Sequence, residues 1–243
     1  MNWHARYTQQ SKWTRDLRAY LFEKTGLTRA KHVLEVGCGT GAILSTLETS
    51  ASLHGLDLDQ AALTQCRIHA PVASLTHGDA LHLPYKDQTF DITFCHFFLL
   101  WVENPLAALL EMKRITKLNG YILALAEPNY RARIDKPAKL VQLGKWQTES
   151  LLRQGADPGV GARLANLFHQ AGIRLIETGA IQSRGNEALE PDEWENEWAA
   201  LESDLKGIVQ SQEIQQMKNL DRRAWECGER VLDVPTYFAW GQV

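Results

Sequence analysis

The chain has 243 residues, of which 44% are hydrophobic and 23% charged, and its formal net charge is −3. These values describe a globular protein large enough to bury a core, with no electrostatic attraction to nucleic acid or to an anionic membrane. The N-terminus has no signal-peptide pattern, no apolar run approaches the ~20 residues that cross a bilayer, and four scattered cysteines favour reduced thiols, so we expect a cytoplasmic protein.

Short apolar runs alternate with helical patterns over the first half of the chain. A helix is predicted over residues 10–24, where apolar side chains recur every three to four positions. Strands are predicted at 32–36, 52–58, 71–75, 90–97 and 121–127, with helices between them at 41–49, 60–69 and 105–117. This alternation predicts a parallel sheet covered by helices on both faces.

The alternation is interrupted twice after residue 127. Residues 128–157 and 185–233 are predicted to be insertions that are mostly helical. Between them we expect a helix that begins at Asp157-Pro158 and a strand at 173–181. A short aromatic strand is predicted at 237–241. No clean domain boundary is visible, so we expect one sheet with two insertions rather than two domains.

The segment VLEVGCGTGAI, Val33 to Ile43, contains three glycines directly after a predicted strand. Glycines at such a turn let a ligand approach the backbone, and a helix that begins there offers free N–H groups. A Walker phosphate loop is excluded, because no Lys-Ser/Thr follows. The spacing fits both GxGxxA and an ExGxGxG pattern from Glu35, and both patterns expect an acidic residue about 20 positions on. Asp57 is there, so the spacing predicts a ribonucleoside site.

Four motifs together resemble the class I S-adenosylmethionine-dependent methyltransferases, and most closely the broad small-molecule group called type 11. The motifs are VLEVGCGTG, GLDLDQAAL, HGDALHLPYKDQTFDITFCH and ENPLAALLEMKRITKLNGYILALAE. The resemblance implies a Rossmann-like α/β fold: a seven-stranded, mostly parallel sheet with an antiparallel last strand, helices on both faces, and helical insertions after strands 5 and 6. It also implies S-adenosylmethionine as the cofactor and methyl transfer as the activity.

The resemblance implies a single methyltransferase domain over residues 1–243. The N-terminal helical arm is 1–30, the cofactor-binding core is 31–127, and the insertions 128–157 and 185–233 lie on the substrate side.

The resemblance also implies which residues bind the cofactor. The methionine half would face Glu35, Gly37, Cys38, Gly39 and Gly41. The ribose, adenine and sulfonium would contact Asp57, Leu58, Asp79, Ala80, Cys95 and His96. For Asp79 the alternative is a turn aspartate, and for Asp57 it is a helix N-cap, a position that Asp59 fits better.

Methyl transfer from a sulfonium mainly requires alignment and exclusion of water, because the leaving group is already good. A base is needed only when the acceptor arrives protonated, so we expect no triad and no metal. His96 and Glu127, each at the end of a predicted strand, are the candidate catalytic residues. The alternatives are a hydrogen-bonded wall histidine and a carboxylate that caps a loop.

Aromatic residues outside the core are candidate acceptor contacts. Tyr7 and Trp13 lie in the arm, and Trp194 and Trp198 lie one helical turn apart in the second insertion. The first insertion is basic and the second acidic, so the alternative is that the two insertions simply attract each other.

We expect the partner to be a small organic methyl acceptor, and the protein to be a monomer or homodimer without membrane association. A nucleic-acid (RNA) methyltransferase is the nearest alternative, but the fourth strand ends FCHFFL rather than Asn/Asp-Pro-Pro-aromatic. A nicotinamide oxidoreductase would leave Asp79 unexplained. A non-catalytic S-adenosylmethionine-binding protein is the remaining alternative.

Overall fold

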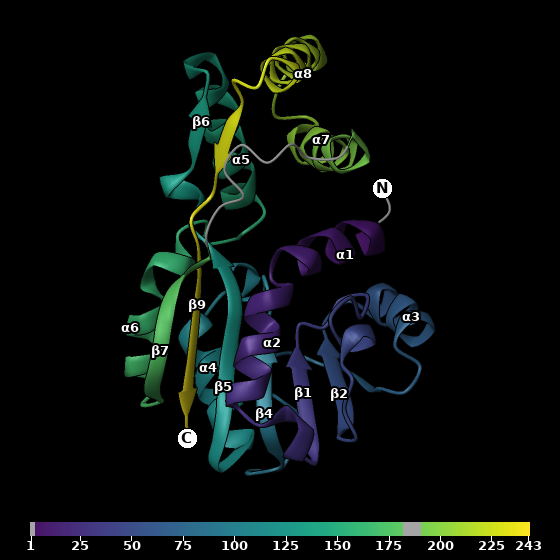
Figure 1. The fold of residues 1–243 in the computed structure, drawn as a ribbon, viewed down its shortest axis with the longest axis vertical. Coiled ribbons are helices and arrows are strands. Elements are labelled where there is room, and N and C mark those ends of the chain that lie inside the picture. Colours follow the sequence, from purple (N-terminus) through teal and green to yellow (C-terminus); the bar gives the residue numbers. More distant parts are fainter. Residues whose placement is uncertain (1–2, 182–190) are drawn as a thin grey trace.

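A seven-stranded sheet forms the centre of the computed structural model, which describes residues 3–181 and 191–243 (Figure 1). The strand order is β3-β2-β1-β4-β5-β9-β7. The strands are β1 (His32–Val36), β2 (Ser52–Asp57), β3 (Ser74–His77), β4 (Phe90–Cys95), β5 (Thr116–Pro128), β7 (Arg174–Ile181) and β9 (Thr236–Gln242). Neighbours among β1 to β5 pair parallel, whereas β9 runs antiparallel to both β5 and β7. The predicted sheet, including its antiparallel last strand, is confirmed.

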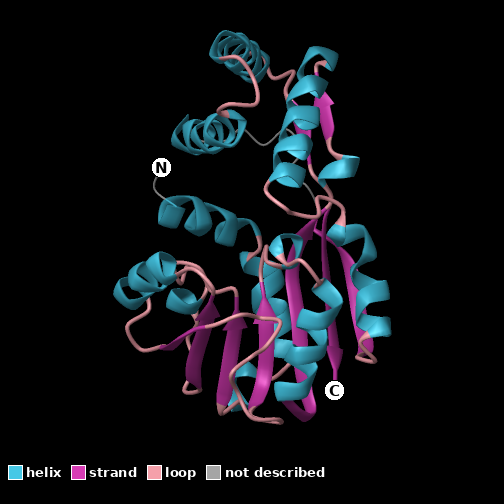
Figure 2. Cartoon of the chain, turned by 180° about the vertical axis from the view of Figure 1, so that it is seen from behind, coloured by secondary structure: helices cyan, strands magenta, loops and turns pink. Residues whose placement is uncertain are grey.

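Helices cover both faces of this sheet (Figures 1 and 2). One face packs against α2 (Arg15–Lys24) and α3 (Gln60–His69), and the other against α4 (Pro105–Ile115) and α6 (Leu164–Gln170). Side chains along β5 alternate between the two cores, with Ile122 and Ala124 on one face and Leu123 and Leu125 on the other. Strands buried on both faces read as continuous apolar runs, which is the pattern seen in the sequence.

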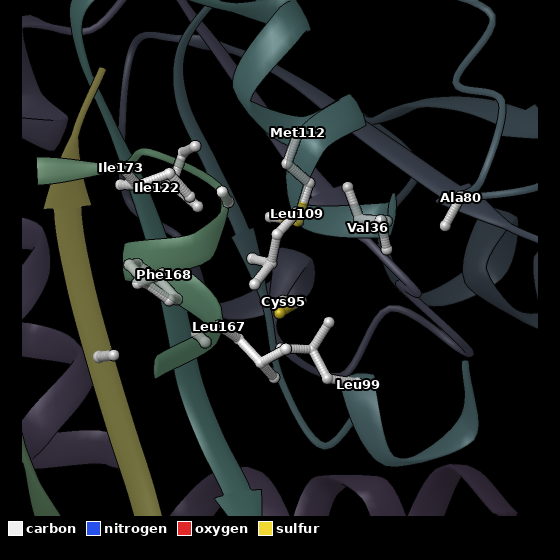
Figure 3. Close-up of a cluster of buried hydrophobic side chains, with 14 of the residues drawn as sticks. Val36, Ala80, Cys95, Leu99, Leu109, Met112, Ile122, Leu167, Phe168 and Ile173 are labelled. Atoms are coloured by element: carbon white, nitrogen blue, oxygen red, sulfur yellow. The ribbon is translucent and has the colours of Figure 1, made fainter. Parts of the chain in front are cut away.

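The α4 and α6 face of the sheet is filled by large apolar side chains (Figure 3). Leu109 and Met112 from α4 pack with Phe168 from α6, and all three side chains are fully buried. Burying one such side chain stabilises the fold by about 1.5–3 kcal/mol. Among the helices of residues 3–181 and 191–243, none has both the length and the apolar character that crossing a membrane requires.

Helix starts follow from their capping residues. Asp59 caps α3, where its Oδ1 accepts from the N–H groups of Ala61 at 2.7 Å and Ala62 at 3.3 Å. Asn104 caps α4 in the same way, accepting from Ala107 N at 3.0 Å. A side-chain acceptor at this position satisfies an N–H that the helix itself leaves free. The assignment of the cap to Asp59, rather than to Asp57, is confirmed.

The helix predicted over 41–49 does not form, and only a 3₁₀ turn, Leu44–Thr46, follows β1. Gly39 and Gly41 have φ values of 51° and 80°, a left-handed backbone that cannot start an α-helix. The hydroxyl of Thr46 then hydrogen-bonds the carbonyl of Ile43, a local pairing that competes with the helix. The glycine turn is therefore longer than the sequence pattern indicates.

Other boundaries also differ from the prediction. The N-terminal region forms two helices, α1 (Trp3–Trp13) and α2, rather than one helix over 10–24. The helix expected at Asp157-Pro158 starts later in the chain. Asp157 Oδ1 accepts a hydrogen bond from Gly159 N at 3.0 Å, and this bond stabilises a turn at that point. A 3₁₀ turn, Val160–Arg163, then leads into α6.

The residues of the two insertions combine into one unit, which we call the cap. It contains β6 (Ile134–Lys136), α5 (Val141–Arg153), α7 (Pro191–Leu205), α8 (Ser211–Glu226) and β8 (Val231–Asp233). β6 and β8 pair antiparallel and so join the two insertions directly. The cap stands beyond the carboxyl ends of β1, β4 and β5, and α1 lies between it and the sheet (Figures 1 and 2). Residues 185–190 of the predicted second insertion lie outside the described residues.

A buried polar network holds the cap together. The indole N–H groups of Trp194 and Trp198 both donate to Asp221 Oδ2 at 2.8 Å. Arg230 pairs with Asp221 and also with Asp135, at 2.7 Å between Nη2 and Oδ1. The two insertions therefore attract each other. The signs are opposite to those expected from their overall charge, because the arginine belongs to the acidic second insertion and the carboxylate to the basic first one.

Candidate cofactor and acceptor site

A cavity of about 620 Å³ lies where the parallel strands end. Its walls come from the ends of β1, β2 and β4, from α1, and from α5 and α7 of the cap. Parallel sheets commonly bind ligands at this edge, because the strand ends and the loops that follow them meet there. The cavity is therefore the candidate functional site.

The glycine turn forms one wall of this cavity. Gly37 and Gly39 line it, with φ values of 75° and 51°. A Cβ atom on Gly37 would lie 2.2 Å from the ring of Phe98, and one on Gly39 would lie 3.3 Å from the ring of Tyr7. A side chain at Gly37 would thus collide with Phe98, and one at Gly39 would make a tight contact with Tyr7. Cys38, between the two glycines, also lines the cavity.

Gly41 has a different task. Its φ of 80° favours glycine, and a Cβ atom at this position would also lie only 2.7 Å from Cys66 Sγ in α3. Gly41 is not part of the cavity wall, and the absence of a side chain at this position lets α3 approach the turn.

Asp57 and Asp79 lie in the same cavity wall, together with Leu58 and Ala80. Asp57 is fixed by two backbone donors, Gly39 N to Oδ2 at 2.7 Å and Asp59 N to Oδ1 at 2.9 Å. Each carboxylate oxygen can accept a further hydrogen bond. Asp79 is exposed and accepts from Leu81 N at 2.9 Å, so it also serves as a turn residue. The spacing of the sequence motifs thus brings both aspartates to one cavity.

Glu35 lies at the base of the cavity and is only 3% exposed. Its Oε2 atom is buried and has no hydrogen-bond partner within the described part of the chain. Burial, with contributions from Cys66 and Asp57, raises the pKa of this carboxyl well above its usual range, although Arg18 opposes the shift. An unsatisfied buried acceptor costs about 1–3 kcal/mol, which a ligand donor would offset. The methionine ammonium of the implied cofactor fits this requirement.

His96 faces the cavity from the end of β4. Its Nε2 shares a hydrogen bond of 2.9 Å with Thr14 Oγ1, which in turn accepts from Arg18 Nη1 at 2.6 Å. Burial, and then the nearby Arg18 charge, lower the pKa of His96 to about 3. The imidazole is therefore neutral at physiological pH.

Cys95, the neighbour of His96, points the other way and is fully buried in the apolar core beside α4 (Figure 3). Cys95 is the last residue of β4, whereas His96 belongs to the loop that follows the strand. Cys95 is not part of the cavity wall, so the structure does not bring it together with the other predicted cofactor contacts.

Glu127 is a loop-capping residue and does not line the cavity. Its side chain accepts from the backbone N–H groups of Phe98, Leu99 and Leu100, at 3.1, 2.9 and 3.3 Å. Burial raises the pKa of Glu127 to about 7, while these N–H donors act in the opposite direction. This placement matches the alternative of a carboxylate that caps a loop. Glu127 instead fixes the loop that carries Phe98 and Leu100 into the cavity wall.

Of the predicted acceptor contacts, only Tyr7 lines the cavity. Trp13 is half-buried outside it. Trp194 and Trp198 are 4% and 3% exposed and form part of the cap core, where Asp221 binds both indoles. Their one-turn spacing thus lies on a face of α7 that is buried in the cap core.

The far wall of the cavity consists of residues that the sequence did not single out. They are Arg6 and Gln10 of α1, Trp101 and Glu103 of the loop after β4, Tyr130, Gln147 and Gln154 of the first insertion, and Asp204 of α7. The α1 residues Trp3, Arg6, Tyr7 and Gln10 follow a three-to-four spacing, a signal that could have identified one helix face. The cap residues carry no such signal, because only packing brings them to the cavity.

Comparisons with known proteins identify the family of this chain. A family model described as a methyltransferase domain matches residues 34–124. A demethylmenaquinone methyltransferase of Lysinibacillus sphaericus is 30% identical over 185 residues, covering 68% of this chain and 77% of that protein. A malonyl-[acyl-carrier protein] O-methyltransferase of Halorhodospira halophila is 30% identical over 187 residues, covering 72% of this chain and 58% of that protein.

The same fold occurs in the crystal structure of a putative methyltransferase from an antibiotic biosynthesis pathway of Anabaena variabilis. The two structures have a TM-score of 0.69 and 15% sequence identity, and the match covers 94% of this chain and 97% of the other. Fold, motifs and sequence relatives agree, and the chain belongs to the class I S-adenosylmethionine-dependent methyltransferases of the small-molecule type.

Proposed function

We propose that this methyltransferase transfers the methyl group to a small organic acceptor held between α1, the loop after β4 and the cap. One observation carries the proposal: a single cavity is lined at one end by Glu35, the glycine turn and Asp57, and at the other by α1 and the cap. Both ends belong to one domain, with the arm and the insertions on the acceptor side.

The cofactor end offers carboxylate acceptors for the ammonium, the ribose hydroxyls and the adenine amine of S-adenosylmethionine. Glu35 would accept from the methionine ammonium, Asp57 from the ribose hydroxyls, and Asp79 from the adenine amine, with Leu58 and Ala80 beside the ring. Carboxylates bind such donors about twice as strongly as neutral acceptors do. When bound, the cofactor supplies a methyl group on a positively charged sulfur, which is a good leaving group.

The protein's own contribution is to align the acceptor and to exclude water. α1 and the loop after β4 supply aromatic walls from Tyr7, Phe97 and Trp101. His96 would orient the acceptor rather than remove a proton, because an imidazole with a pKa of about 3 binds protons weakly. The in-line displacement would therefore rely on positioning.

The experiment is calorimetry with S-adenosylmethionine and its homocysteine product, followed by incubation with labelled cofactor and a metabolite extract. We expect both cofactor forms to bind, and the label to enter a small molecule that mass spectrometry identifies. Absence of binding would refute the proposal. Label in total RNA would favour the nucleic-acid alternative, and binding without any transfer would favour a non-catalytic protein.

A further inference from the structure

Thr14 lies at the junction of α1 and α2, directly behind His96 of the cavity wall. Its side chain is buried, and its hydroxyl oxygen has three hydrogen-bond neighbours: Arg18 Nη1 at 2.6 Å, His96 Nε2 at 2.9 Å and Ser11 O at 3.2 Å. Neither Thr14 nor Arg18 lines the cavity, whereas His96 does. One hydroxyl thus links a buried guanidinium to a residue of the acceptor site.

The Thr14 hydroxyl has a single hydrogen, so it can donate to only one neighbour. A guanidinium has no acceptor atom, so the Thr14 oxygen accepts from Arg18 and its hydrogen goes either to Ser11 O or to His96 Nε2. O–H donors favour distances of about 2.5–3.0 Å, a range that the longer contact to Ser11 O exceeds. Ser11 O also accepts from Thr14 N at 3.3 Å and from Arg18 Nη1. The geometry therefore directs the hydroxyl to His96, with Nε2 as the acceptor.

The other ring nitrogen of His96 must then carry the hydrogen. Burial, and then the Arg18 charge, lower the pKa of His96 to about 3, so the ring is neutral and has one N–H group and one lone pair. Because Nε2 accepts from Thr14, the N–H group is at Nδ1. Nδ1 has no hydrogen-bond partner within residues 3–181 and 191–243. It is therefore a donor available to a molecule in the cavity.

The charges of the site, including the positive sulfur of the bound cofactor, favour an oxygen as the partner of this N–H group. A neutral His96 adds no second positive charge to the cavity. Arg6 pairs with Glu197 at 3.0 Å and also interacts with Asp204. An electron-rich oxygen is attracted both by an N–H donor and by a sulfonium, whereas a protonated amine is repelled by the sulfonium and cannot accept from His96.

We infer that Thr14 is a positioning residue that holds His96 as an Nδ1–H donor, and that this group binds a carbonyl or ionised oxygen of the methyl acceptor. The acceptor part rests on the methyl transfer proposed above, whereas the state of the imidazole does not. With both nitrogens engaged, His96 takes up no proton, so the nucleophilic atom enters with a free electron pair. That pair forms the new bond to the methyl carbon, and the sulfur keeps the pair of the broken bond.

Nitrogen NMR of the histidine rings tests the state of His96 without any substrate. In protein with isotope-labelled histidine, Nδ1 and Nε2 give separate signals, and their loss in His96→Gln assigns those of His96 among the eight histidines. We expect the wild type at neutral pH to carry the hydrogen on Nδ1 alone. A hydrogen on Nε2, a mixture of the two forms, or a charged ring would overturn the inference.

Thr14→Val and Thr14→Ser form the matched pair of variants. Valine keeps the branched shape of threonine but has no hydroxyl, so the single Nδ1–H form should be lost, whereas serine should retain it. An unchanged His96 spectrum in Thr14→Val would overturn the positioning role of Thr14. If this variant fails to fold, the wild-type spectrum still decides where the hydrogen lies.

Kinetics on the acceptor found by labelling test the second part. Thr14→Val should lower kcat/KM about 2- to 10-fold, the range for one neutral hydrogen bond, with cofactor affinity unchanged and activity restored in Thr14→Ser. An acceptor without a carbonyl or ionisable oxygen, or an unchanged kcat/KM, would overturn this part and leave the proposed function standing. Lack of transfer to any small molecule would refute the proposed function, while the NMR result would still hold.

Discussion

Replacing Asp57 by asparagine should weaken cofactor binding strongly. The carboxylate is fixed by Gly39 N at 2.7 Å and by Asp59 N at 2.9 Å, and it faces the cavity. Loss of a hydrogen bond to a charged acceptor costs about 1.5–3 kcal/mol, and each 1.4 kcal/mol is tenfold, so affinity should fall roughly 10- to 150-fold. An asparagine must also turn its NH₂ group toward one of the two backbone donors, which disturbs the glycine turn and favours the upper part of that range.

Calorimetry with S-adenosylmethionine measures the effect of Asp57→Asn, and thermal unfolding shows whether the fold is intact. Asp59→Asn is the matched control, since asparagine is as good an N-cap as aspartate and Asp59 does not line the cavity. The control should bind the cofactor like the wild type. Affinity of Asp57→Asn within threefold of the wild type would refute the reasoning, because the ribose would then be held by other groups.

Three further substitutions test the rest of the description. Asp221→Ala should lower the free energy of unfolding by about 3–5 kcal/mol in urea denaturation, because Arg230 and two indole N–H groups lose their buried acceptor; a loss below about 1 kcal/mol would contradict this. Burial raises the pKa of Asp91, but the hydrogen bond from Lys117 helps hold this pKa below its ordinary value of 3.8. The ionised carboxylate therefore stabilises the fold above pH 3.8, and this stabilisation is lost as the pH falls through the lower pKa of the folded state. The difference in unfolding free energy between wild type and Asp91→Asn should therefore shrink below pH 3.8, and a constant difference from pH 7 to 3 would argue against it. His96→Ala should slow turnover and leave cofactor affinity unchanged. Because the pKa of His96 is about 3, the imidazole should stay neutral around pH 6.5. A wild-type rate profile with an inflection near pH 6.5 that disappears in this variant would contradict that expectation.

The cofactor half of the site could be predicted from the sequence, because it depends on strand order and on residues at strand ends. Asp57 ends β2 and His96 follows β4, so a parallel sheet brings both to one edge whatever the details of packing. Glu127 also ends a strand, yet it turns to the N–H groups of the loop after β4. Position at a strand end therefore identifies candidates, and only the hydrogen-bond partners decide which of them face a ligand.

The acceptor half could not be predicted, because it depends on contacts between segments far apart in the chain. Trp194 and Trp198 have the spacing of a helix face, but a spacing does not say what that face meets. The structure shows that it meets Asp221 of α8. Asp204, on the same helix, lines the cavity instead. Which side of α7 is buried is settled by α8, and no local pattern records that choice.

The joining of the two insertions has a consequence for how such enzymes can change their acceptor. The strand pair β6–β8 and the Asp135–Arg230 ion pair make residues 134–153 and 191–233 interdependent. Replacing one insertion alone would leave Asp135 or Arg230 buried without its partner, whereas replacing both insertions together would keep such a pair intact and leave the cofactor half unchanged. An attempt to change the acceptor of this protein should therefore replace residues 134–153 and 191–233 together.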